Sequence, residues 1–169
     1  EGVAALAGCP GLRALNARSC PGLEDACVRR LAAGCPALAS LNLRECPLLT
    51  DEAIVTVAQH CRELKVLSVT GLHLLTDRSV EAVAHSCHQL EALNCCDCPL
   101  VTERAVAAVA RSCPHLRSLK CSTPLGDAAA ATMAACWSGL VQLHLVGSGA
   151  FSDHALAALA KGCELLQDV

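Results

Sequence analysis

A spacing of 26 residues recurs along the chain and constrains the fold more than any other feature. A cysteine occurs at this spacing at Cys9, Cys35, Cys61, Cys87 and Cys113. Leucines keep the spacing at Leu12, Leu38, Leu64, Leu90 and Leu116, and again at Leu15, Leu41, Leu67, Leu93 and Leu119. Acidic residues follow at Asp25, Asp51, Asp77, Glu103, Asp127 and Asp153, where one interval is 24. Several coincident ladders of this period are the signature of a repeat protein.

Each copy of the repeat predicts a short strand followed by a helix. In the clearest copy, 35–60, apolar and polar residues alternate over 38–43, as in a half-buried strand. Thr50 and Asp51 then supply a cap and a negative charge for a helix start. The apolar residues within 53–61 fall on one helical face. We therefore expect an α/β solenoid of about six strand–helix repeats, with a parallel sheet on the concave face.

The composition limits both the core and the kinds of partner. Hydrophobic residues make up 53% of the chain, but with one Trp, one Phe and no Tyr the core must be built from Leu, Val, Ala and Cys. The net charge of −3 does not favour nucleic acid or an anionic membrane as a partner. No apolar run is long enough to span a bilayer, and no secretory signal pattern is visible. These features predict a reduced protein of the cytoplasm or nucleus.

The start of the chain bears on its domain organisation. The first residue is Glu1 and not Met. Residues 1–169 are therefore expected to form one repeat domain that is a fragment of a longer array.

The consensus of the copies carries a family resemblance. The pattern C-P-x-L-x-x-L-x-L-x-x-C-x-x-[LV]-[TS]-D resembles the cysteine-containing leucine-rich repeats of the F-box and leucine-rich-repeat proteins, over nearly the whole chain. The resemblance implies a leucine-rich-repeat horseshoe that serves as the substrate-recognition repeats of a cullin-type ubiquitin ligase. It also implies a cullin-ligase adaptor as a partner, bound through an F-box segment that these residues do not contain.

The repeat explains twelve of the fourteen cysteines. Six lie between helix and strand, three just after a strand, two at a strand leucine position and one at a helix alanine position: Cys9, Cys35, Cys61, Cys87, Cys113 and Cys163; Cys20, Cys46 and Cys98; Cys95 and Cys121; and Cys27. We expect these thiols to be buried and to donate weak hydrogen bonds to loop carbonyls. Trp137 takes the ladder position in the copy that is two residues short. Cys96 and Cys136 have no such place, and strand alternation points Cys96 away from Cys95, which disfavours a shared metal site.

The outward residues of the strands predict a binding surface. Alternation places polar and basic side chains on the concave face, together with Thr70. The residues expected to bind a protein partner are Asn16, Arg18, Asn42, Arg44, Asn94, Cys96, Lys120 and His144. Amides and guanidiniums on a rigid sheet suit an extended peptide or an acidic surface. The loop residues Glu45, His73 and Asp97 are secondary candidates.

Two other functions stay open. A stand-alone leucine-rich-repeat scaffold or inhibitor would use the same fold without coupling to a ligase. A thiol-dependent redox or metal-binding protein would use the region around Cys96. No arrangement of residues indicates nucleophilic catalysis, a cofactor or a metal site, so we expect a protein-binding module and not an enzyme.

Overall fold

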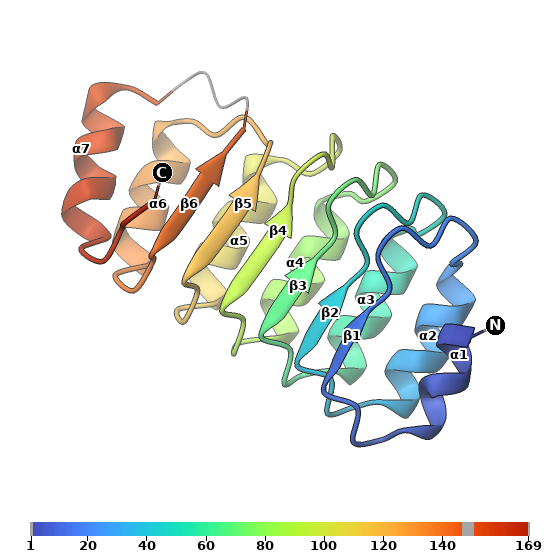
Figure 1. Cartoon of the computed structure of the whole chain (residues 1–169). Coiled ribbons are helices and arrows are strands. Elements are labelled where there is room, and N and C mark those ends of the chain that lie inside the picture. The colour runs from blue at the N-terminus through green and yellow to red at the C-terminus, as the bar shows by residue number, and fades with distance from the viewer. Residues whose placement is uncertain (1, 147–150, 169) are drawn as a thin grey trace.

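The strands lie side by side in chain order and form one parallel sheet. The computed structural model describes residues 2–146 and 151–168 and is shown in Figure 1. Its six strands are β1 (Ala14–Asn16), β2 (Ser40–Asn42), β3 (Val66–Ser68), β4 (Ala92–Cys95), β5 (Ser118–Cys121) and β6 (Gln142–Leu145). Ser40 pairs with Val66 at the usual interval, whereas Ser118 pairs with Gln142 two residues earlier than the repeat would give. The fifth copy therefore loses its two residues from the loop before the next helix and not from the sheet.

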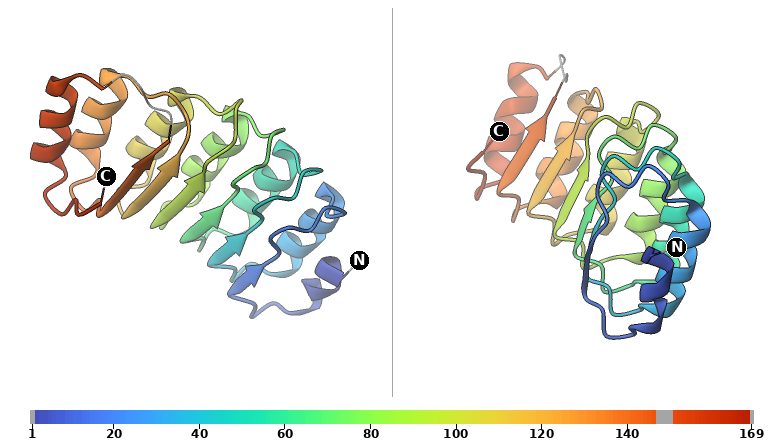
Figure 2. Two further views of the ribbon diagram at one scale, coloured as in Figure 1. Left: turned by 45° about the horizontal axis from the view of Figure 1, so that its top comes forward. Right: turned by 45° about the vertical axis from the view of Figure 1, so that its right-hand side comes forward.

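A helix follows each strand and covers the outer side of the sheet. The helices are α1 (Gly2–Ala5), α2 (Asp25–Gly34), α3 (Asp51–His60), α4 (Asp77–Ser86), α5 (Glu103–Ser112), α6 (Asp127–Cys136) and α7 (Asp153–Gly162), with a 3-10 turn η1 (Leu6–Gly8) before β1. Figure 2 shows the strands along the inner side of the arc and the helices along its outer side. The predicted α/β solenoid with a concave parallel sheet is confirmed. Within the described residues, no helix has the length and apolar character needed to cross a membrane.

Carboxylates join neighbouring copies where the helices start. Asp51 in the first turn of α3 accepts two hydrogen bonds from Thr76, from its backbone N–H at 2.9 Å and its hydroxyl at 2.6 Å. The same Thr76 hydroxyl oxygen accepts the N–H of Arg78 and so caps α4. The carboxylate pairing recurs in Asp25 with Thr50, Asp77 with Thr102, and Asp127 with Ser152. The acidic ladder of the sequence thus binds each copy to the next.

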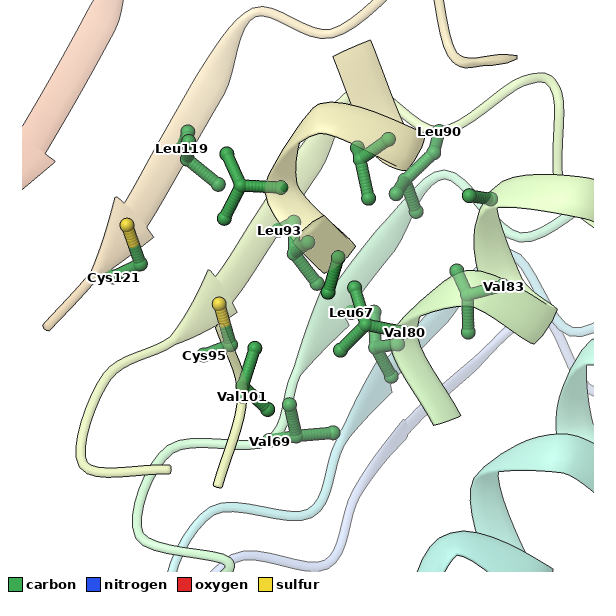
Figure 3. Packing of buried hydrophobic residues seen from close by; sticks show 14 of the residues in the cluster. Leu67, Val69, Val80, Val83, Leu90, Leu93, Cys95, Val101, Leu119 and Cys121 are labelled. Carbon is green, nitrogen blue, oxygen red and sulfur yellow. The ribbon is translucent and has the colours of Figure 1, made fainter. Parts of the chain in front are cut away.

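The core is one layer of aliphatic side chains between the sheet and the helices. Leu67, Leu93 and Leu119 come from three neighbouring strands and are almost fully buried. Figure 3 shows Leu67 and Leu93 near Val80 of α4, with Leu119 farther along the same layer. Since equivalent residues repeat from copy to copy, each leucine contacts its own counterpart on the next strand, and the layer continues along the array.

The cysteine ladder ties each turn to the preceding one. The thiols of Cys61, Cys87 and Cys113 donate to the carbonyl of the cysteine one copy earlier, at 3.5–3.6 Å. Trp137 continues this ladder, because its buried indole N–H donates to the Cys113 carbonyl at 3.0 Å. In the second ladder, the thiols of Cys46 and Cys98 donate to the carbonyls of Ala17 and Val69, both at 3.2 Å. The prediction of buried thiols that donate to loop carbonyls is confirmed for these ladders.

The prediction that all twelve repeat cysteines are buried is wrong for the first copy. Nine of the twelve are buried, but Cys9 is exposed and Cys20 and Cys27 are half-buried. In the described chain only α1 and η1 precede the first copy, so contacts from the strand and loop of an earlier copy are missing here. Every cysteine is a free thiol.

The carboxylate ladder predicts a stability difference between two matched variants. Replacing Asp51 by Ala removes both hydrogen bonds from Thr76, and we expect the free energy of unfolding to fall by about 1–3 kcal/mol. Asp153 occupies the same place in α7 but bonds no later copy in the described residues, so Asp153→Ala should cost only about 0.3–1 kcal/mol through the helix dipole. Urea denaturation of the two variants measures the difference, and equal losses would contradict the role given to the ladder.

Thiol burial predicts a wide range of reactivity. Burial raises the pKa of Cys61 and Cys87 to about 12, so few thiolates form at pH 8. Cys9 is exposed and should be alkylated first, with the two buried thiols at least about a hundredfold slower. Timed iodoacetamide labelling followed by peptide mapping measures the order, with urea-unfolded protein as the control in which all sites react. Rapid labelling of Cys61 or Cys87 in the folded protein would overturn the assignment.

Candidate functional site

The concave face carries the predicted residues in two rows that run across the strands. Strand register places Asn16 beside Asn42, and then Ser68, Asn94, Lys120 and His144 in succession, one on each strand. Arg18, Arg44 and Cys96 follow two residues later in their own copies. Neighbouring parallel strands lie roughly 4.8 Å apart, so the first row is a continuous line of side chains across the sheet. The structure therefore brings all eight predicted residues onto one face.

The asparagines present donors and not acceptors to a partner. The Oδ1 atoms of Asn16, Asn42 and Asn94 each accept the backbone N–H two residues later, at 3.1–3.2 Å. A backbone N–H can only donate, so these bonds fix which end of the amide faces the chain. The Nδ2 groups make no hydrogen bond within the described part of the chain and remain available. The amides thus stabilise the turn after each strand and offer N–H groups on the face.

The charges on this face are also donors. The side chains of Arg18 and Lys120 have no hydrogen-bond or ion-pair partner in the described ranges 2–146 and 151–168, whereas Arg44 Nε lies 2.9 Å from Glu45 Oε1. His144 Nε2 lies 2.9 Å from Asp168 Oδ2. The face between β1 and β5 therefore combines amide N–H groups with two unpaired cations, and it would bind carboxylates or phosphates better than cations.

Cys96 and Thr70 differ in how they take part in this face. Cys96 is half-buried, and its burial raises the pKa of the thiol although Arg44 and Lys120 oppose the shift. The thiol is then mostly protonated at neutral pH and is a weak nucleophile. Thr70 lies on the expected face, since its hydroxyl donates to Asn94 Oδ1 at 2.8 Å, but it is only 5% exposed. Its short side chain therefore bonds the next strand and is not open to a partner.

The three loop candidates lie together on the rim that follows the strands. Glu45, His73 and Asp97 line one cavity of about 370 Å³, together with Pro47 and Gly71. Sequence reasoning named the three side chains but missed Gly71, the residue that leaves space between them. The sequence does show that Gly71 differs from its counterparts, because the equivalent positions of the neighbouring copies carry Ser19, Glu45 and Asp97. Among the described residues, no group of three or more His, Cys, Asp or Glu is placed to hold a metal ion.

Known proteins share the fold of this chain at low sequence identity. No protein-family model matches the chain, and no curated protein matches it. An internalin (inlF) from Listeria monocytogenes aligns over 98% of this chain and 49% of its own at a TM-score of 0.66 and 18% identity. The tropomodulin C-terminal domain from Caenorhabditis elegans aligns over 97% of this chain and 90% of its own, at a TM-score of 0.60 and 12% identity.

Yeast Rad7, solved in a complex with Elc1, is a third structure with this arrangement. It aligns over 79% of this chain at a TM-score of 0.51 and 20% identity, and the chain spans 42% of the length of Rad7. The chain likewise spans about half of the internalin. Together with the confirmed repeat geometry, these likenesses show that the chain has the α/β solenoid fold of leucine-rich-repeat proteins.

Proposed function

We propose that this chain is a protein-interaction module whose concave face binds an acidic, acceptor-rich segment of another protein. The observation that carries the proposal is the set of hydrogen-bond donors across the sheet, which we call the donor row. Asn16, Asn42 and Asn94 direct their Nδ2 groups away from the backbone that holds Oδ1. Arg18 and Lys120 add cations that have no partner in the part of the chain that the structure describes. A carboxylate-bearing segment would satisfy these donors with charge-assisted hydrogen bonds.

We further propose that the module recognises substrates for a cullin-type ubiquitin ligase of the cytoplasm or nucleus. The cysteine-containing pattern of the repeats supports this role, and so does the likeness of the fold to Rad7, which was solved with Elc1. The adaptor of such a ligase would bind an F-box segment outside the residues described. In this role the chain itself performs no chemistry.

The donor row predicts that charge reversal weakens partner binding. The double change Arg18→Glu and Arg44→Glu places two carboxylates where the partner needs donors, and we expect the affinity for a captured partner to fall at least about tenfold. The matched control is Arg29→Glu with Arg30→Glu, two exposed arginines on α2, which should leave the affinity unchanged. Partners are captured from cell extract, identified, and titrated against each variant, with circular dichroism to verify the fold. Unchanged affinity of the first variant would place the site elsewhere.

The ligase role has its own test. The full-length protein should co-purify with the cullin-ligase adaptor, and failure to do so would leave a stand-alone scaffold or inhibitor as the function. Stoichiometric bound metal would instead favour a metal-binding protein. A thiol-dependent protein would be favoured if thiol oxidation abolished partner binding in the unaltered protein and in the control Cys136→Ser but not in Cys96→Ser.

A further inference from the structure

In each of the first four copies, one backbone position after the strand lies in the left-handed region and directs its side chain to the rim. Ser19, Glu45 and Asp97 have φ values of 55°, 58° and 56°, and Gly71 has a φ of 75°. Three of these four positions therefore carry a side chain and the third copy carries none. A Cβ placed on Gly71 would lie 3.7 Å from Glu45 Cγ, its nearest neighbour, which is ordinary van der Waals contact without a clash. Gly71 contributes no side chain to the cavity that Glu45 and Asp97 line.

Two carboxylates, those of Glu45 and Asp97, flank this cavity. Glu45 is held by the Ser19 hydroxyl at 2.7 Å and by Arg44 at 2.9 Å, and these bonds lower the pKa of its carboxyl. The Asp97 carboxylate makes no hydrogen bond or ion pair with any residue that the structure describes. The two residues stand two strands apart, roughly 10 Å at the backbone. A guanidinium or ammonium group that enters between them could bond to both.

Exposed leucines border the same rim. Leu48, Leu74 and Leu100 keep the repeat spacing and are 49%, 50% and 53% exposed, although the next residue of each copy is buried. They follow Pro47, His73 and Pro99 directly, so the cavity lies beside this row. A contiguous row of half-exposed leucines is a common feature of protein-binding surfaces.

We propose that this rim is a second docking surface, which takes an arginine or lysine side chain of a partner protein into the cavity at Gly71. Glu45 and Asp97 bind its cationic head, and Pro47 and His73 line the cavity along its methylene stem. Apolar side chains on either side of the basic residue pack on Leu48, Leu74 and Leu100. Charge complementarity selects this partner over an acidic one, in contrast to the donor row on the concave face. The two surfaces touch only where Arg44 pairs with Glu45, and the rim variants below change no residue of the concave face, so either proposal can fail alone.

The test uses the tripeptide acetyl-Leu-Arg-Leu-amide and the folded protein labelled with ¹⁵N. Titration should shift the Gly71 amide, which donates to the Cys96 carbonyl at 2.9 Å, and the shift should saturate. Acetyl-Leu-Glu-Leu-amide should produce no saturable shift, and acetyl-Ser-Arg-Ser-amide should bind more weakly because it lacks the apolar contacts. High salt should weaken the binding of the arginine peptide, since salt screens the attraction between exposed charges.

Two variants with matched controls locate the binding. Gly71→Asn fills the cavity with a residue that tolerates positive φ, and we expect at least about a tenfold loss of affinity. Gly22 lies on the same rim with nothing within 4 Å of an added Cβ, and Gly22→Asn should bind the arginine peptide as the unaltered protein does. Asp97→Asn should lower the affinity for the arginine peptide about two- to fivefold. Glu63→Gln removes one exposed charge from the loop before β3, at the other end of the strands, and should leave the affinity unchanged. The proposal is overturned if no peptide shifts Gly71 saturably, if the glutamate peptide binds as well, or if Gly71→Asn binds like the unaltered protein.

Discussion

A strand of three or four residues and a helix of ten cannot bury an apolar face on their own, so every copy in this chain depends on contact with the next. The aliphatic layer supplies most of that contact, and its pattern helps to set the register because a shift by one residue would turn the leucines away from the core. The polar bonds support the same register, because a carboxylate at one helix start and a thiol at one turn bond defined groups of the neighbouring copy. The alignment of the concave rows follows from this register.

The irregular fifth copy shows how much change this constraint allows. Its shortened loop replaces the capping threonine by Gly126, whose N–H still donates to Glu103 at 3.1 Å. At the other end of α6 the indole N–H of Trp137 reaches the Cys113 carbonyl that a thiol would otherwise bond. The helix between them is mostly alanine, which leaves room for the large ring in the core. The bonds between copies are kept while the residues that make them change.

The fold could be predicted from the sequence because the same pattern recurs in every copy, so that an inference from one copy can be checked against the others. Strand and helix positions, the concave face and the place of Trp137 all follow from periodicity, which burial and register obey. What periodicity does not show is how a short polar side chain divides its hydrogen bonds. Thr70 has the spacing of a surface residue but bonds to Asn94, and the asparagines use their oxygens on the backbone. These choices depend on distances of a few tenths of an ångström, which a pattern of residue types does not contain.

The cavity at Gly71 escaped prediction for a related reason. A glycine at a position with positive φ is ordinarily explained by its backbone, and the sequence offers no other reason for it. The structure removes that explanation, because Ser19, Glu45 and Asp97 adopt a similar positive φ in the first, second and fourth copies with side chains present. Backbone conformation therefore does not require glycine in the third copy, and the lack of a side chain matters for the space it leaves. The donor row and the acidic rim meet at Arg44 and Glu45, so a single partner that covers both surfaces must change from acidic to basic along its own chain.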